Sequence, residues 1–209
     1  MVTNSNPLDY PKHAAIASSK RDQPITERPA TEPATEIEAG LDPALLQEVD
    51  VRTEQAGGRQ RKISAQIQIP HSVEQIWQIL TDYETLADFI PNLAKSQRIE
   101  HPSGGIRLEQ VGSQCLLNFH FCARVVLDMV ETFPNLIEFR MVEGDFKTFE
   151  GQWRLQPAID SCDTTDLTYT VVVCPPRLMP ANIIERRLNQ NLRVNLVSIH
   201  QRAYQLFGS

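Results

Sequence analysis

The chain has 209 residues, a length that suits a single domain with a tail. Hydrophobic residues make up 41% of it and charged residues 22%, and both shares are close to ordinary globular usage. The formal net charge of −6 argues against nucleic acid as a partner, because a nucleic-acid-binding surface is positively charged.

The first part of the chain, residues 1–55, is predicted to be a disordered, acidic, proline-rich tail. It holds six prolines, and its ten acidic residues outnumber five basic ones, which leaves a charge of −5. Such a segment cannot bury enough apolar surface to offset the entropy lost on ordering. Within it, residues 41–49 are expected to form a short helix. Gly57 and Gly58 mark the hinge into the folded domain, which we expect over residues 56–209.

The start of the chain shows no sign of a targeting segment. Residues 1–19 have no apolar core and are interrupted by Pro7 and Pro11, so no signal peptide is predicted. No run approaches the roughly 18 to 20 apolar residues of a membrane-spanning helix. A cytoplasmic protein is therefore expected, at most peripheral to a membrane.

The domain should begin with a strand and a helix. Residues 63–69 alternate apolar and polar side chains, which is the period of a half-buried strand, and Pro70 ends it. Ser72 and Gln75 then have the spacing of a capping box, so a helix should start there and stop near Asp82. Its apolar face consists of Val73, Ile76, Trp77 and Leu80.

A meander of strands should follow, because alternating segments are separated by turn residues. Antiparallel strands need only tight turns between them. The polar stretch 160–166 is predicted to be a loop. The expected strands cover residues 94–101, 106–112, 115–131, 136–142, 146–155 and 167–173.

The chain should close with a long helix after Pro180, because apolar residues recur there every three or four positions. The stripe consists of Ile184, Leu188, Leu192, Asn195, Ile199, Ala203 and Leu206. A helix with such a stripe must bury it against another layer. The predicted fold class is therefore α+β, a curved antiparallel sheet of six to seven strands around the long C-terminal helix, with an internal space between them.

Two segments carry a resemblance to a known family. They are IPHSVEQIWQILTDYETLADFIPNLAKSQ at residues 69–97 and VEGDFKTFEGQWRLQP at residues 142–157, and the closing helix agrees with both. Over residues 59–206 the chain resembles the START-like superfamily, whose fold is called helix-grip. It is most similar to the branch of polyketide cyclases/dehydrases and coenzyme Q-binding proteins. The resemblance implies a short second helix within residues 82–93, with Phe89 and Ile90 buried under the long one.

The resemblance implies that the protein binds or carries a hydrophobic small molecule, a lipid or prenylquinone, in an internal cavity. The alternative is a cyclase or dehydrase acting on a polyketide-like or aromatic substrate, and similarity of fold does not choose between them. A non-enzymatic role is favoured, because proton-transfer catalysis needs a positioned acid or base and none is evident. No cofactor is expected. A third hypothesis makes the acidic tail a binding segment for another protein.

The predicted cavity wall combines the apolar face of the strands with the stripe of the long helix. Asn195 stands out in that stripe, because a polar side chain on a buried face needs a partner. That partner is predicted to be either the sheet backbone or the ligand. The residues expected to contact a ligand are Phe119, Phe121, Phe139, Phe149, Trp153, Tyr169, Leu192, Asn195 and Ile199.

No catalytic or metal site is predicted from the histidines and cysteines. His13, His71 and His101 are expected to be solvated, and His120 should lie on the solvent face of its strand. His200, at the edge of the helix stripe, is expected to be half-exposed or to contact a ligand. The cysteines show no C-x-x-C spacing, so reduced thiols are expected at Cys115, Cys122, Cys162 and Cys174.

Two charged surfaces are predicted. One is a solvated cross-strand face formed by Glu138, Arg140, Glu150, Gln152 and Arg154. The other lies in the C-terminal segment, where five arginines and one acidic residue follow Pro176, which gives a charge of +4. The second surface is either a solvated helix face or a site that contacts an anionic membrane through Arg186, Arg187 and Arg193.

Overall fold

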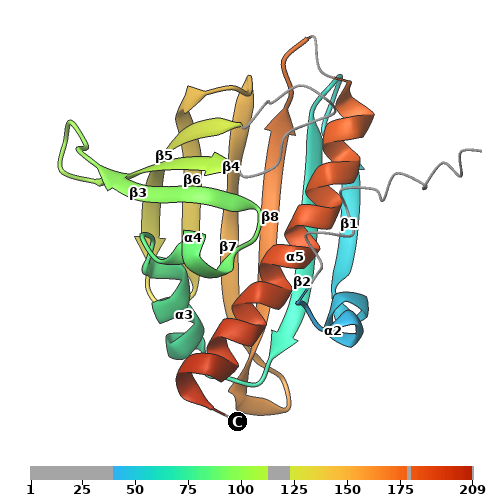
Figure 1. Ribbon diagram of the computed structural model, residues 1–209, viewed down its shortest axis with the longest axis vertical. Coiled ribbons are helices and arrows are strands. Elements are labelled where there is room, and N and C mark those ends of the chain that lie inside the picture. The colour runs from blue at the N-terminus through green and yellow to red at the C-terminus, as the bar shows by residue number, and fades with distance from the viewer. Residues whose placement is uncertain (1–39, 113–122, 178–179, 209) are drawn as a thin grey trace, which may run out of the picture. The chain divides into compact units, whose positions relative to one another are not determined.

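The structure is a computed structural model that describes residues 40–112, 123–177 and 180–208 (Figure 1). These residues form one antiparallel sheet in the strand order β1-β2-β8-β7-β6-β5-β4-β3. The strands are β1 Asp50–Gln55, β2 Arg61–Ile69, β3 Leu93–Ile99, β4 Ile106–Gly112, β5 Arg124–Thr132, β6 Leu136–Gly144, β7 Thr148–Ala158 and β8 Ser161–Cys174. The helices are α2 Pro43–Glu48, α3 Val73–Thr81, α4 Leu86–Phe89 and α5 Ala181–Phe207.

Helix α5 runs across one face of the sheet, and α3 and α4 lie on that same face (Figure 1). This is the predicted α+β helix-grip arrangement. The predicted helix start is also confirmed. The hydroxyl of Ser72 accepts a hydrogen bond from the backbone N–H of Gln75, and the side chain of Gln75 accepts one from the N–H of Ser72. The two bonds satisfy N–H groups that the first turn of α3 leaves without helical partners.

The sheet has eight described strands, more than the six to seven expected, and the domain boundary predicted at residue 56 is wrong. Residues 43–55, assigned to the tail, form α2 and β1. Strand β1 pairs with β2 over its whole length, from Asp50 opposite Gln66 to Gln55 opposite Arg61. An edge strand gains its stability from backbone hydrogen bonds along one side, so a polar sequence suffices. Residues 1–39 lie outside the described part of the chain.

Helix α2 is held in place by its own cap and by an arginine of α5. The carboxylate of Asp42 accepts a hydrogen bond from the N–H of Ala44, which caps the helix start. At the other end, Nη1 of Arg193 donates to the carbonyl oxygens of Leu46, at 3.1 Å, and Val49, at 2.8 Å. The short helix expected over residues 41–49 is therefore present and is attached to α5.

Two predictions about the meander need correction. The stretch 160–166 is not a loop, because β8 already begins at Ser161 and pairs there with β7. Thr165 is fully buried, and its hydroxyl donates to the carbonyl of His71, so a polar residue is satisfied inside the sheet. The long strand expected over residues 115–131 is described only from Arg124. The predictions for Phe119, Phe121 and His120 lie outside the described residues.

Ile184, Leu192, Ile199 and Ala203 of the α5 stripe are buried, as expected. Leu188 and Asn195 are half-buried, and Leu206 is 49% exposed. The last turn of the helix therefore extends past the apolar layer. Ile90 is buried, as predicted, whereas Phe89 is only half-buried, with the guanidinium of Arg202 lying 5.5 Å from the centre of its ring. The described part of the chain contains no helix that is both long and apolar enough to cross a membrane.

Candidate functional site

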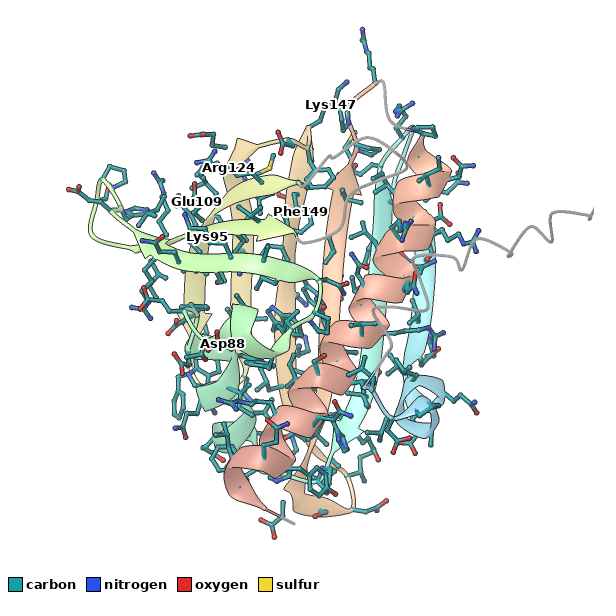
Figure 2. All side chains as sticks on the ribbon, viewed as in Figure 1. Asp88, Lys95, Glu109, Arg124, Lys147 and Phe149 are labelled. Atoms are coloured by element: carbon teal, nitrogen blue, oxygen red, sulfur yellow. The ribbon has the colours of Figure 1, made fainter. Side chains whose placement is uncertain are left out.

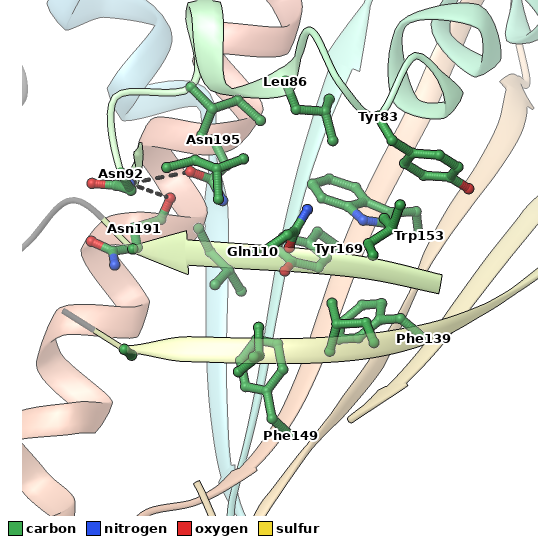
Figure 3. Close-up of a pocket in the computed structure, with 18 of the residues that line it drawn as sticks. Tyr83, Leu86, Asn92, Gln110, Phe139, Phe149, Trp153, Tyr169, Asn191 and Asn195 are labelled. Atoms are coloured by element: carbon green, nitrogen blue, oxygen red, sulfur yellow. Dashed lines mark hydrogen bonds between the residues drawn. The ribbon is translucent and has the colours of Figure 1, made fainter. Parts of the chain in front are cut away.

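A cavity of about 190 Å³ lies between the sheet and helices α4 and α5 (Figure 3). Strands β4 to β8, the connection between α3 and α4, and one face of α5 supply its walls. Side chains alternate along each strand, so Leu108 and Gln110 of β4 and Val125 and Leu127 of β5 point to the same side. A cavity of about 150 Å³ can hold benzene. The space therefore accommodates one six-membered ring with a small substituent.

One wall of the cavity is aromatic. Trp153 and Tyr169, opposite each other on β7 and β8, stack with ring centroids 3.6 Å apart and planes 3° from parallel. Phe139 lies 6.0 Å from Tyr169 and 5.6 Å from Phe149, which stacks on Phe146 at 5.4 Å. These rings form a continuous aromatic surface, in which Phe139 is tilted by 52° from Tyr169 and by 37° from Phe149. A planar apolar ligand can pack against it.

Gly151 makes the close packing of this wall possible. It pairs with Phe139 across β6 and β7. A Cβ at this position would lie 2.6 Å from Cζ of Phe139 and 2.0 Å from the carbonyl oxygen of Thr170. Any other residue would therefore displace the ring or the neighbouring strand.

Three asparagines form the polar end of the cavity. Nδ2 of Asn92, at the turn before β3, lies 3.2 Å from Oδ1 of Asn195 and 3.4 Å from the backbone oxygen of Asn191, both on α5 (Figure 3). Asn195 had been expected to bond the sheet backbone or a ligand. Its protein partner is instead a side chain of the α4–β3 turn, 103 positions away in the sequence.

Tyr83 and Tyr169 are the ionisable side chains among the described residues that line the cavity. Burial raises the pKa of Tyr83 far above its ordinary value, and its hydroxyl donates a 2.6 Å hydrogen bond to Oε1 of Glu131, which raises that pKa further. Burial alone raises the pKa of Tyr169. Both phenols are therefore neutral at physiological pH, and the single O–H of Tyr83 is already donated to Glu131.

The described lining residues contain no lysine, arginine, histidine, aspartate, glutamate or cysteine. Nor do the described residues anywhere include a group of three His, Cys, Asp or Glu side chains that could hold a metal ion. As it stands, the arrangement is suited to desolvating and orienting a ring through aromatic contact and a few uncharged polar groups.

Of the residues predicted to contact a ligand, the cavity brings together Phe139, Phe149, Trp153, Tyr169, Leu192 and Asn195. Ile199 does not line it. One full turn beyond Asn195 on α5, Ile199 is completely buried in the hydrophobic core. That these side chains contact a ligand stays a prediction.

Several lining residues were not predicted. Tyr83 and Asn92 lie in the segment 82–93, for which only a short second helix had been expected. Gln110 and Phe146 also line the cavity, and Nε2 of Gln110 lies 3.2 Å from the hydroxyl of Ser96. The alternation that places Gln110 beside Leu108 on one face of β4 could have identified it.

The histidines differ from expectation. His71 is buried, not solvated, and its Nε2 lies 2.9 Å from the carbonyl oxygen of Gly208. His101 is half-buried, with Nε2 3.5 Å from Oδ2 of Asp128. His200 is buried and lies outside the cavity lining, with its ring 5.1 Å from that of Tyr204, and this burial lowers its pKa.

The outer face of the sheet carries a ladder of charges. Lys95, Glu109, Arg124 and Glu143 lie on four successive strands, and each forms an ion pair with its neighbour. Figure 2 labels the first three of them. Arg140 and Glu150 form a longer, exposed pair of 3.9 Å, in agreement with the predicted solvated face. Exposed pairs of this kind contribute little stability each.

The basic C-terminal segment is only partly free to contact a membrane. Arg186 is exposed and Arg187 is half-buried. Arg193 had been grouped with them, but its guanidinium is used inside the protein, where it holds the end of α2.

Cys174 is a free, half-buried thiol, and the other three cysteine side chains lie outside the described residues.

Residues 69–197 match the model of a family described as polyketide cyclase/dehydrase and lipid transport. None of the curated proteins compared with the chain matches it in sequence.

Several solved structures share the fold. A START superfamily protein from Mycobacterium smegmatis has a TM-score of 0.60 and 17% identity, over 69% of this chain and 98% of the other. The Zhui aromatase/cyclase from Streptomyces sp. R1128 has a TM-score of 0.60 and 15% identity, over 70% and 94%. A STAR-related lipid transfer protein fragment from Xanthomonas axonopodis has a TM-score of 0.60 and 14% identity, over 76% and 95%. At these identities the similarity concerns the fold alone.

Proposed function

The chain belongs to the polyketide cyclase/dehydrase and lipid transport family, and we propose that within it the protein binds or carries a hydrophobic small molecule without transforming it. The observation that carries the proposal is the aromatic wall of Phe139, Phe149, Trp153 and Tyr169, which lines an unfilled pocket between the sheet and the helices. An aromatic surface that remains uncovered in a fold is stabilised when a planar apolar ligand covers it.

The size of the space limits what enters it. At about 190 Å³, it holds a single ring or a short chain end. For a lipid or a prenylquinone, the proposal therefore places one ring or chain segment against the aromatic wall, with the rest of the molecule outside this space.

The alternative function, a cyclase or dehydrase reaction, requires a group that removes or donates a proton at the substrate. The described lining residues supply only the phenols of Tyr83 and Tyr169, whose raised pKa values keep them protonated at neutral pH. A neutral phenol can orient a carbonyl but is a poor base. Binding is therefore favoured over catalysis.

The proposal extends to where the molecule is delivered. Arg186 and Arg187 lie next to each other near the start of α5, and Arg177 is exposed just before that helix. Each basic residue close to an anionic surface contributes about 1 kcal/mol of attraction. We therefore propose peripheral contact with anionic membranes through this end of α5, without Arg193.

Binding in the cavity is tested with fluorobenzene, an apolar probe of suitable size, titrated against the full-length protein and followed by 19F NMR. Val125→Phe places a ring in the cavity, and Leu188→Trp blocks it from the opposite wall on α5. Val130→Phe is the matched control, because Val130 is on the same strand but is 59% exposed on the outer face.

We expect the wild-type protein and Val130→Phe to bind the probe with the same affinity, and both cavity variants to lose binding. Because overpacking costs about 1–3 kcal/mol, thermal melting must show that the cavity variants are folded at the assay temperature. Undiminished binding by both folded cavity variants would place the probe elsewhere and exclude this cavity as the site.

A further inference from the structure

We infer that the cavity selects an uncharged ring that carries a hydrogen-bond-accepting oxygen, such as a ketone or quinone carbonyl, and that Asn195 is the residue that donates to it. This inference rests on the proposed binding function and adds the chemical class of the ligand to it. Three features support it: the orientation of the asparagine amides, the position of the Asn195 amide nitrogen, and the absence of charge on the described walls.

The orientation of the amides is fixed by a backbone carbonyl. A carbonyl oxygen can only accept a hydrogen bond, so the Asn92 atom that faces the backbone oxygen of Asn191 at 3.4 Å must be its nitrogen, Nδ2. The same nitrogen faces the side chain of Asn195 at 3.2 Å, so the atom that Asn195 turns towards it must be the oxygen, Oδ1. Turning either amide over would bring two acceptors or two donors together.

This orientation leaves the amide nitrogen of Asn195 on the side away from Asn92, towards the middle of the pocket (Figure 3). Asn195 is half-buried and lines the cavity. No described residue accepts a hydrogen bond from its Nδ2. A partly buried donor without a protein partner gains free energy from any ligand that brings an acceptor to it.

The walls favour an uncharged ligand. A carboxylate or phosphate in the cavity would lose its hydration, and that loss is offset only where a cation lies close. None of the described lining residues is a lysine, an arginine or a histidine.

The aromatic wall and the asparagine donor act on different parts of one ligand. The rings of Trp153 and Phe149 cover the apolar face of a planar molecule, while Asn195 on α5 meets an oxygen at its edge. A planar ring with a carbonyl substituent satisfies both the aromatic wall and the Asn195 donor. A plain hydrocarbon leaves the donor unpaired, and a fatty-acid carboxylate would have no counter-ion in the cavity.

Three probes of nearly the same shape separate these possibilities: 4-fluoroacetophenone, 4-fluoro-α-methylstyrene and 4-fluorobenzoate. The first two differ only in a carbonyl oxygen against a methylene group, and the third replaces the ketone by a charge. Dissociation constants are measured by 19F NMR on the full-length protein. We expect the ketone to bind about tenfold more tightly than the hydrocarbon, the effect of one hydrogen bond, and the benzoate to bind more weakly than either.

Two variants assign the preference to Asn195. Asn195→Leu removes the donor, and Asn195→Asp keeps an oxygen for Asn92 while removing the donor, so both should bind ketone and hydrocarbon within about twofold of each other. Asn182→Leu is the control, because Asn182 is exposed near the start of α5, and it should keep the tenfold preference.

Equal binding of ketone and hydrocarbon by the wild-type protein would overturn the inference, and so would a full preference in both Asn195 variants. Benzoate binding as tight as that of the ketone would overturn the claim that the ligand is uncharged. In each of these results the hydrocarbon still binds, so the proposed function survives. Failure of all three probes to bind would contradict the proposed function itself.

Discussion

The attachment of α2 to α5 gives the sharpest stability prediction. Nη1 of Arg193 donates one hydrogen bond to the carbonyl of Leu46 and one to the carbonyl of Val49, where α2 ends. Arg193→Met keeps most of the aliphatic side chain and removes both bonds. The carbonyl groups at a helix end have no helical partners, so the substitution leaves them unsatisfied beside a buried Val49.

The expected loss follows from the two bonds. A hydrogen bond to a charged group contributes about 1.5–3 kcal/mol, and because Arg193 is only half-buried the lower end applies to each bond, which gives about 3 kcal/mol for the pair. For a domain of this size that corresponds to a decrease in Tm of about 6–12 °C. Helix α2 has six residues, far fewer than a helix needs to persist alone, so the loss should appear first as local opening of α2.

The assay is hydrogen–deuterium exchange followed by mass spectrometry, together with thermal melting. Arg193→Met should show faster exchange in peptides that cover residues 41–55, with smaller changes in α3 and β7. Arg187→Met is the control, because it removes an arginine of the same helix that makes no hydrogen bond or ion pair with the described residues. The reasoning is refuted if the two variants melt within about 1 °C of each other and exchange alike over residues 41–55.

The remaining predictions concern the aromatic wall, a buried histidine and the basic surface. Gly151→Ala should cost about 1–3 kcal/mol in urea unfolding, because its Cβ would lie 2.6 Å from Cζ of Phe139, and an unchanged midpoint would contradict this. Burial lowers the pKa of His200 below its ordinary 6.5, so below that pH the unfolded chain binds a proton that the folded chain does not. The stability of the fold should therefore decrease as the pH is lowered from 7 to 5. His200→Gln should flatten this dependence of Tm on pH. The double variant Arg186→Gln, Arg187→Gln should reduce flotation with phosphatidylserine-containing vesicles, and equal recovery of wild type and variant would remove the membrane proposal.

The regular elements could be predicted because their signals are local. The alternation in β2 and the capping box of α3 depend on residues within one or two turns of each other, and both are present as expected. The burial of Ile184, Leu192, Ile199 and Ala203 on one side of α5 follows from the same kind of periodicity. These features need no knowledge of distant parts of the chain.

Elements stabilised mainly by backbone pairing were missed. Strand β1 can be polar because it lies at the edge of the sheet and is held by backbone pairing with β2. The first residues of β8 can be polar because they pair with neighbouring strands and the hydroxyl of Thr165 donates to the carbonyl of His71. Composition gives no signal for either, since such residues are typical of loops and tails as well. The same reason led the predicted domain to begin at residue 56.

The sequence by itself determined that a long helix with an apolar stripe must lie on an antiparallel sheet. It also determined that the aromatic side chains of β6 to β8 lie on the face of the sheet that this helix covers. It did not determine which buried residues pack together and which enclose a space. Leu192 lines the cavity and Ile199 fills the core, although both belong to one stripe. The two residues differ because the distance of the sheet and α4 from α5 leaves a space beside Leu192 but not beside Ile199.

Tertiary structure alone also decided the chemistry of the polar end. The sequence shows that Asn195 is a polar residue in an apolar stripe, but an amide can present either its oxygen or its nitrogen. The choice is made by Asn92, brought from the turn before β3, and by the fixed direction of the Asn191 carbonyl. A contact between residues about a hundred positions apart is absent from any local pattern, and this contact sets which atom the cavity offers to a ligand.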